Sequence, residues 1–227
     1  MTTISTNLQA VRARIAAAAQ LAGRAVEDIR LLAVSKTFPP ERIREAALAG
    51  QIAFGENYLQ ESLGKIAALA DLGLEWHFIG PLQSNKTRPV AEHFSWVHGI
   101  ERLKIAERLS AARGPARPPL QVCIQVNVSG EASKSGVSPG ETAALAHAVA
   151  GLPNLRLRGL MAIPEPTDDM PLVRQRFAML RELLEALNKA GMALDTLSMG
   201  MSHDLEAAIL EGATIVRVGT AIFGERT

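Results

Sequence analysis

The stretch LLAVSKTFPP, residues 31–40, shows how a buried strand passes into a helix in this chain. Its apolar start, LLAV, is typical of a parallel strand that is buried on both faces. Two prolines and Glu41 then open a helix that Gly50 ends, as proline and glycine do at opposite helix ends. An open doubly wound sheet usually carries a glycine-rich fingerprint after its first strand, and this stretch has no glycine. The stretch therefore favours a barrel over an open sheet.

The same alternation of strand and helix patterns continues along the chain. We expect eight strands, at residues 31–36, 51–57, 75–80, 95–100, 120–127, 155–163, 194–200 and 214–220. One more helical pattern, with Ile4, Leu8, Val11 and Ile15 on one face, precedes the first strand. Eight strand–helix units within 227 residues predict an α/β fold, a single (β/α)8 TIM barrel with an extra N-terminal helix, and residues 1–227 as one domain. An open doubly wound sheet is the alternative.

Two later helices carry their own start and stop signals. Asp168 and Asp169 precede an apolar stripe that Gly191 closes. Ser202 has the pattern of an N-cap, with acidic residues in the turn that follows and Gly212 just past the end.

Composition excludes several classes of protein. The chain has 24 Lys and Arg against 23 Asp and Glu, which argues against a general nucleic-acid binder. Cys123 is the single cysteine, so an intramolecular disulfide and a cysteine-rich metal site are excluded, and its mid-strand position favours a core role. No signal peptide and no apolar run of about 18 residues is found. We expect a cytoplasmic protein that binds neither membrane nor nucleic acid.

Function in a barrel of this type lies at the carboxyl ends of the strands. Lys36 ends the first predicted strand, and Asn57 ends the second. A lysine that enters a desolvated pocket has a lowered pKa, and its unprotonated amine can form a Schiff base. A solvated lysine at the strand end is the alternative interpretation.

The seventh and eighth predicted strands end in hydroxyls and glycines. The seventh ends in SMGMS, residues 198–202, and the eighth in Gly219 and Thr220. Barrels often bind phosphate in the loops after these two strands, with backbone N–H groups. The pattern predicts a phosphate site, although glycines that only turn the chain and serines that only cap a helix would give the same signal.

Arg217 lies two residues before Gly219, so both point to the same side of the strand. An inward arginine needs a partner, either a heterocyclic nitrogen that accepts a hydrogen bond or a carboxylate such as that of Glu56. The histidines His93, His98, His147 and His203 show no metal-ligand spacing and are interpreted as ordinary surface or core residues.

Seven motifs together point to a known family. They are LLAVSKTFP, FGENYLQE, WHFIGPLQSNK, VNVSGEASKSG, LRGLMAIP, LSMGMSHDLEAAI and VRVGTAIFGER. In this order, and over nearly the full chain, they resemble the pyridoxal phosphate homeostasis proteins of the YggS and PROSC type.

The resemblance implies an alanine-racemase-like barrel of fold type III that lacks the C-terminal β-domain of alanine racemases. It implies pyridoxal 5′-phosphate (PLP) as the cofactor, bound as an internal aldimine on Lys36, with Arg217 facing the pyridine nitrogen. The other cofactor-binding residues that it implies are Asn57 near the cofactor and, around the phosphate, Ser198, Ser202, Gly219 and Thr220. His203 is a departure, because many family members carry an acidic residue there.

The chemistry of Arg217 bears on catalysis. An arginine donates to a pyridine nitrogen but cannot protonate it, and a neutral ring nitrogen is a weaker electron sink than a pyridinium. In alanine racemases a tyrosine from the β-domain supplies a second acid/base group, whereas Tyr58 is the only tyrosine here. We therefore expect a non-catalytic, monomeric PLP carrier without metal, with apo PLP-dependent enzymes as recipients.

Two other functions stay open at this stage. One is a small PLP-dependent amino-acid racemase that uses the same aldimine, and the other is a cofactor-free enzyme that forms Schiff bases directly on Lys36. Lys86 and Lys134 lie on loops after the third and fifth strands and would form a second electropositive patch, or else are ordinary solvated lysines.

Overall fold

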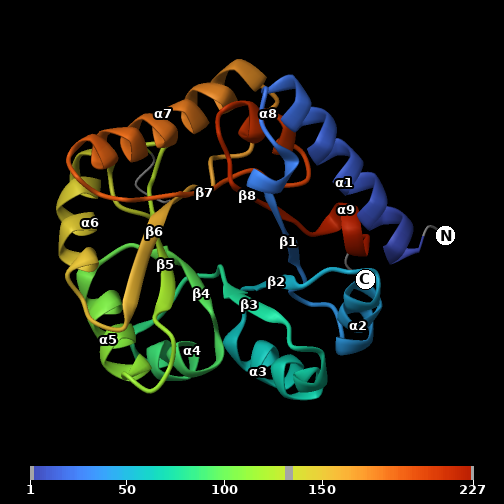
Figure 1. Cartoon of the computed structure of the whole chain (residues 1–227), viewed down its shortest axis with the longest axis horizontal. Helices are drawn as coiled ribbons and strands as arrows, with labels where there is room; N and C mark the ends of the chain where they lie inside the picture. The colour runs from blue at the N-terminus through green and yellow to red at the C-terminus, as the bar shows by residue number, and fades with distance from the viewer. Residues whose placement is uncertain (1–2, 131–134, 226–227) are drawn as a thin grey trace.

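The computed structural model describes residues 3–130 and 135–225, and its centre is a closed barrel of eight parallel strands (Figure 1). Each strand pairs with its neighbours in sequence, and β8 pairs with β1 to close the ring. The strands are β1 (Arg30–Val34), β2 (Ala53–Glu56), β3 (Glu75–Phe78), β4 (Trp96–Ile100), β5 (Leu120–Gln125), β6 (Leu155–Met161), β7 (Thr196–Ser198) and β8 (Ile215–Val218). The predicted barrel and all eight predicted strands are confirmed.

Helices form a ring around the barrel (Figure 1). They are α1 (Ile4–Leu21), α2 (Pro40–Leu48), α3 (Leu59–Ala68), α4 (Thr87–His93), α5 (Leu103–Arg113), α6 (Thr142–Ala150), α7 (Met170–Lys189), α8 (Leu205–Leu210) and α9 (Thr220–Phe223). The predicted extra helix, α1, packs against α8, α9 and α2. Its predicted apolar face, Ile4, Leu8, Val11 and Ile15, is buried there.

The core has two layers, one inside the barrel and one between the strands and the helices. The inner layer includes Leu32, Trp96, Cys123 and Met161. Burial raises the pKa of the Cys123 thiol to about 12, so this cysteine stays protonated. The core role predicted for Cys123 is thus confirmed.

The predicted helix ends are right in two helices and wrong in a third. Pro40 is the first residue of α2, and the Asp169 side chain accepts a hydrogen bond from the N–H of Leu172 at the start of α7. Ser202 is not an N-cap, because α8 begins later, after Asp204. The Asp204 carboxylate accepts a hydrogen bond from the N–H of Met201, at 2.6 Å, and this turn separates Ser202 from the helix.

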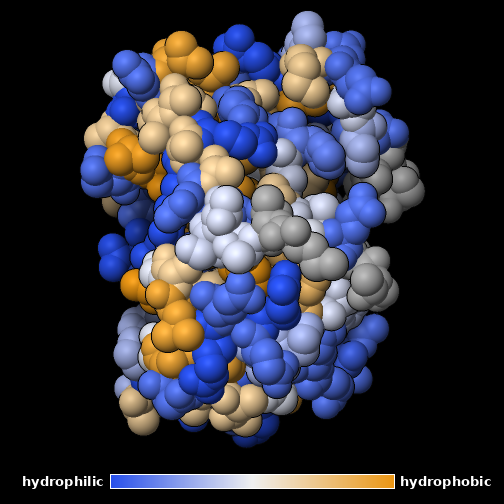
Figure 2. All heavy atoms as spheres, turned by 90° about the vertical axis from the view of Figure 1, so that its right-hand side faces the viewer, coloured by the Kyte–Doolittle hydropathy of each residue, from blue (hydrophilic) through white to orange (hydrophobic). Residues whose placement is uncertain are grey.

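The surface over α1 and α2 is mostly hydrophilic. Figure 2 shows this side of the molecule with hydrophobic residues in separate patches. Within residues 3–130 and 135–225, no helix has both the length and the apolar character needed to cross a membrane.

We predict that β6 and β7 can pack this closely only with glycine at position 159. A Cβ on Gly159 would lie 1.9 Å from the carbonyl oxygen of Thr196. Gly159→Ala should therefore lower the free energy of unfolding by about 1–3 kcal/mol or more, measured by urea denaturation. Gly64→Ala is the matched control, because nothing lies within 4 Å of its Cβ position on α3. It should stabilise the chain by about 0.5–1 kcal/mol, and equal effects of the two substitutions would contradict the packing argument.

Candidate functional site

A pocket of about 200 Å³ opens at the carboxyl ends of the strands, and we call it the rim pocket. Six of the seven predicted cofactor-binding residues line it: Lys36, Asn57, Ser202, Arg217, Gly219 and Thr220. Apolar side chains, among them Val34 and Ile79, complete the wall. Since pockets for drug-sized ligands span about 300–1,000 Å³, this volume suits one small ligand.

The seventh predicted residue, Ser198, lies beneath the rim pocket rather than along its wall. Its side chain is fully buried at the end of β7, with Oγ 2.8 Å from Arg217 Nη1 and 2.8 Å from His98 Nδ1. A phosphate contact by Ser198 stays a prediction that these contacts do not support.

The loop that carries Lys36 is held by a cluster of charged residues. Lys65 Nζ donates to the backbone oxygen of Ser35 and to Glu56 Oε1, both at 2.8 Å, and also pairs with Glu61. Glu61 Oε1 in turn accepts a hydrogen bond from the N–H of Thr37, at 2.6 Å. Both neighbours of Lys36 in sequence are therefore tied to this cluster, although Thr37 has a φ of +71°, a strained value for a non-glycine residue.

Glu56 belongs to this cluster and not to Arg217. Its side chain is fully buried between the barrel and α3, and Ser35 Oγ donates to it at 2.7 Å. Burial raises the pKa of Glu56, while the ammonium of Lys65 opposes that shift. The alternative in which Glu56 pairs with Arg217 is wrong, because the side chain leaves the strand on the side that faces the helices.

Arg217 extends into the barrel and is only 3% exposed. Nη1 donates to Ser198 Oγ and Nη2 donates to the carbonyl oxygen of Ala162, both at 2.8 Å. Burial lowers the pKa of Arg217 to about 10, against the influence of Asp204, so the guanidinium remains charged at neutral pH. A guanidinium has five N–H groups, so others remain for a ligand in the rim pocket.

Asn57 provides a sign that the pocket takes a polar ligand. Its Oδ1 is buried and has no hydrogen-bond partner within the part of the chain that the structure describes. Because buried polar atoms are nearly always paired, such an atom in a pocket wall points to a missing partner. The hydroxyls of Ser202 and Thr220 lie in the same pocket wall.

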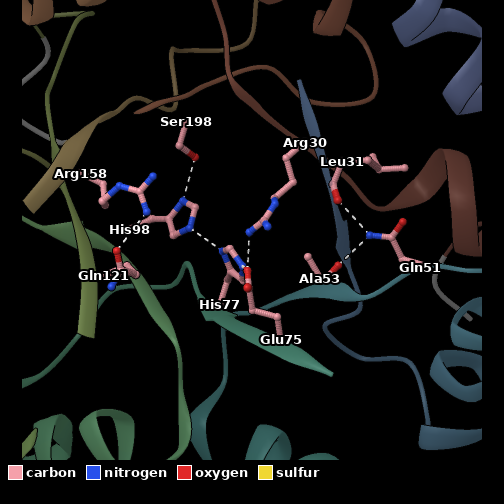
Figure 3. A network of polar contacts seen from close by, with 10 residues as sticks. All are labelled: Arg30, Leu31, Gln51, Ala53, Glu75, His77, His98, Gln121, Arg158 and Ser198. Carbon is pink, nitrogen blue, oxygen red and sulfur yellow. Dashed lines mark hydrogen bonds and ion pairs between the residues drawn. The ribbon is translucent and has the colours of Figure 1, made fainter. Parts of the chain in front are cut away.

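A chain of polar contacts that was not predicted from the sequence crosses the barrel below the pocket (Figure 3). It runs from Ser198 through His98 and His77 to Glu75 at the start of β3. The signal for it was present, because His77 and His98 interrupt neighbouring apolar strands. His98 is a core residue, as one of the two interpretations expected, but its partners could not be inferred from spacing.

Three further residues singled out from the sequence, His203, Tyr58 and Lys86, lie at or near the same rim. His203, interpreted as ordinary, lines the rim pocket and is exposed. Tyr58 is 54% exposed and outside the pocket lining. Lys86 is exposed after β3, whereas Lys134 lies outside the described residues, so the predicted electropositive patch stays a prediction.

Comparison with known proteins gives consistent matches. A family model described as the alanine racemase N-terminal domain matches residues 6–227. The pyridoxal phosphate homeostasis protein of Pseudomonas aeruginosa is 66% identical over 226 residues, which is 100% of this chain and 97% of the relative. The protein of that name from Escherichia coli is 56% identical over 234 residues, covering 100% of this chain and 98% of the relative. Among solved structures, PipY of Synechococcus elongatus with PLP bound is 38% identical, with a TM-score of 0.82, covering 92% of this chain and 100% of PipY.

We predict that Lys65→Met destabilises the chain by about 3–5 kcal/mol at pH 8, because it leaves the buried Glu56 carboxylate unpaired. Losing Lys65 removes an influence that lowers the pKa of Glu56, so this pKa rises further. Below that pKa the carboxyl is neutral and its burial costs less, so the deficit relative to wild type should shrink at pH 5. The measurement is urea denaturation at both pH values.

The control for this prediction is Lys104→Met, at an exposed position on α5. It should change the free energy of unfolding by less than about 0.5 kcal/mol at either pH. A Lys65→Met deficit that stays constant from pH 8 to pH 5 would contradict the assignment to Glu56.

Proposed function

The chain belongs to the family of pyridoxal phosphate homeostasis proteins, and from this premise we propose that it binds PLP in the rim pocket, holds it as a Schiff base on Lys36 and releases it reversibly. The observation that carries the proposal is the convergence of Lys36, Arg217 and Asn57 on one small pocket. The structure of PipY with PLP bound supports the choice of ligand.

PLP supplies an aldehyde, a ring nitrogen and a phosphate, and each has a suitable partner in the pocket wall. The Lys36 amine is the nucleophile for the aldehyde. Arg217 can donate a hydrogen bond to the ring nitrogen. The hydroxyls of Ser202 and Thr220, with the backbone at Gly219, would hold the phosphate, and the buried Asn57 Oδ1 would gain a partner from the ligand or its water.

The proposed role is that of a carrier without catalysis. Arg217 is a permanent donor, so it leaves the ring nitrogen unprotonated and gives carbanion chemistry weak support. The relatives are named homeostasis proteins. In this proposal residues 1–227 act as one PLP-binding domain, monomeric and cytoplasmic, with apo PLP-dependent enzymes as recipients.

An amino-acid racemase is the second candidate, and one observation favours it. His203 lines the same pocket as Lys36, so two groups that can move a proton share the site. Both candidates use the same Schiff base, and only turnover separates them.

We predict that the purified protein takes up PLP with a visible absorption band that borohydride abolishes while fixing PLP covalently to Lys36. Peptide mass spectrometry locates the modified residue. Lys36→Ala should lose both the band and the covalent adduct, because no other lysine lines the rim pocket in the part of the chain described. Lys104→Ala, at an exposed lysine of α5, should behave as wild type. A wild-type protein that takes up no PLP would overturn the proposed function.

We also predict that the PLP-loaded protein does not exchange the α-hydrogen of amino acids with solvent deuterium. Proton NMR of each standard amino acid in deuterium oxide measures this exchange, with a known alanine racemase as positive control. Exchange that disappears in Lys36→Ala would favour the racemase. Loss of that exchange in His203→Ala as well would identify the second proton-transfer group.

A further inference from the structure

Below the rim pocket, four polar side chains form a continuous line through the barrel, and we call Glu75, His77, His98 and Ser198 the buried column (Figure 3). The contacts are 2.6 Å from Glu75 Oε1 to His77 Nε2, 2.9 Å from His77 Nδ1 to His98 Nε2, and 2.8 Å from His98 Nδ1 to Ser198 Oγ. Arg217 Nη1 meets the same Ser198 oxygen at 2.8 Å.

The column is a costly feature in this position. Barrel interiors of this type are filled by branched apolar side chains. His77, His98 and Ser198 are fully buried, and such groups are tolerated only when each finds its hydrogen-bond partners. Each of the three makes two contacts, one upward and one downward, so the column is complete along its length.

The charges at its two ends fix the direction in which the column donates. Arg217 has only donors, so its hydrogen bond leaves the Ser198 hydroxyl free to donate onward to His98 Nδ1. His98 then carries its proton on Nε2 and donates to His77 Nδ1. His77 likewise carries its proton on Nε2 and donates to the Glu75 carboxylate. With both imidazoles neutral and Glu75 ionised, no other assignment satisfies all four contacts.

The local electrostatics agree with these protonation states. Burial lowers the pKa of His77 and lowers that of His98 well below its ordinary value, so both are neutral at neutral pH. Burial opposes ionisation of Glu75, but the hydrogen bond from His77 and the nearby charge of Arg30 outweigh it and lower the pKa of Glu75. Glu75 also pairs with Arg30 at the opposite mouth of the barrel, which anchors the lower end of the column.

We infer that Ser198, His98 and His77 are positioning residues for Arg217: they hold its guanidinium against the ring of the bound cofactor, and Ser198 does not contact the phosphate. The inference rests on the proposed binding of PLP. Ser198 accepts from Nη1 while Ala162 accepts from Nη2, so two separate nitrogens of the guanidinium are fixed. The Ser198 hydroxyl proton is already used toward His98, which leaves Ser198 without a donor for phosphate oxygens.

The first test determines the protonation of the two histidines of the buried column in the protein without ligand. Long-range ¹H–¹⁵N NMR of the unliganded protein should show His77 and His98 as neutral rings protonated on Nε2 at neutral pH. The signals are assigned by their loss in His77→Gln and His98→Gln. A ring protonated on Nδ1, or on both nitrogens, would overturn the donor direction and with it the inference.

The second test compares PLP with pyridoxal, which has the same ring but no phosphate. Ser198→Ala should weaken the binding of both ligands by about tenfold, because it removes a hydrogen bond to a charged group that serves the ring. Ser202→Ala should weaken PLP binding but leave pyridoxal binding unchanged. Ser110→Ala is the matched control, since this buried serine donates to a backbone oxygen of Pro153 on the outer layer, and it should bind both ligands as wild type does.

Each other outcome has a defined meaning. If Ser198→Ala weakened the binding of PLP but not of pyridoxal, Ser198 would be a phosphate contact and the inference would be overturned. Unchanged binding of both ligands by this variant would also overturn it. Failure of the wild-type protein to bind either ligand would instead remove the proposed function, whatever the NMR experiment shows. If Ser198→Ala does not fold, the NMR measurement on the wild-type protein still tests the donor direction along the buried column, on which the inference depends.

Discussion

Hydrogen bonds between β8 and β1 close the barrel, and the site depends on this closure. The register places Leu32 beside Arg217 and Ala33 beside Val218. Because all strands run parallel, their carboxyl ends meet at one rim, and closure makes the first and last strands neighbours there. In an open sheet with the same strand order, β1 and β8 would lie at opposite edges. Lys36 and Arg217, which are far apart in the sequence, would then not share a pocket.

Two buried polar networks flank the rim pocket, and each stabilises buried polar groups in a different layer of the core. Lys65, Glu56 and Glu61 form one network, the Lys65 cluster, where α3 meets the barrel. Lys65 compensates the charge of Glu56 and also holds the loop that carries Lys36. The buried column lies inside the barrel and extends from Glu75 to Arg217. A buried charge is costly unless it is paired and hydrogen-bonded, so each network stabilises a polar group that its apolar surroundings would otherwise exclude. Each side of the pocket is thus supported by a polar network.

The sequence predicted the parts of this structure that depend on local pattern. Apolar runs, with prolines and glycines at the ends of helices, were sufficient to predict the eight strands. Strand-end chemistry together with the family resemblance predicted six residues that line one pocket. Contacts between distant strands carry no such signal. Ser198 and His98 meet although they lie a hundred residues apart, whereas the strand-end position of Ser198 and the family resemblance implied a phosphate role for it. The N-cap predicted at Ser202 was wrong for a related reason. The Asp204 carboxylate accepts a hydrogen bond from the N–H of Met201, and the sequence pattern gave no sign of this contact.

The contrast between the two sides of the pocket bears on what a carrier needs. Arg217 is held from below by Ser198, a side chain with no exposure to solvent, so its guanidinium has little freedom. Lys36 lies instead on a loop beside the strained Thr37, tied in part through Glu61, whose side chain is 32% exposed. Strain of this kind persists only where the surroundings hold it, and a partly exposed ion pair holds it more weakly than a buried one. In the proposed carrier, Lys36 would therefore form the reversible bond on the more flexible side of the pocket. Arg217 would recognise the ring on the more rigid side.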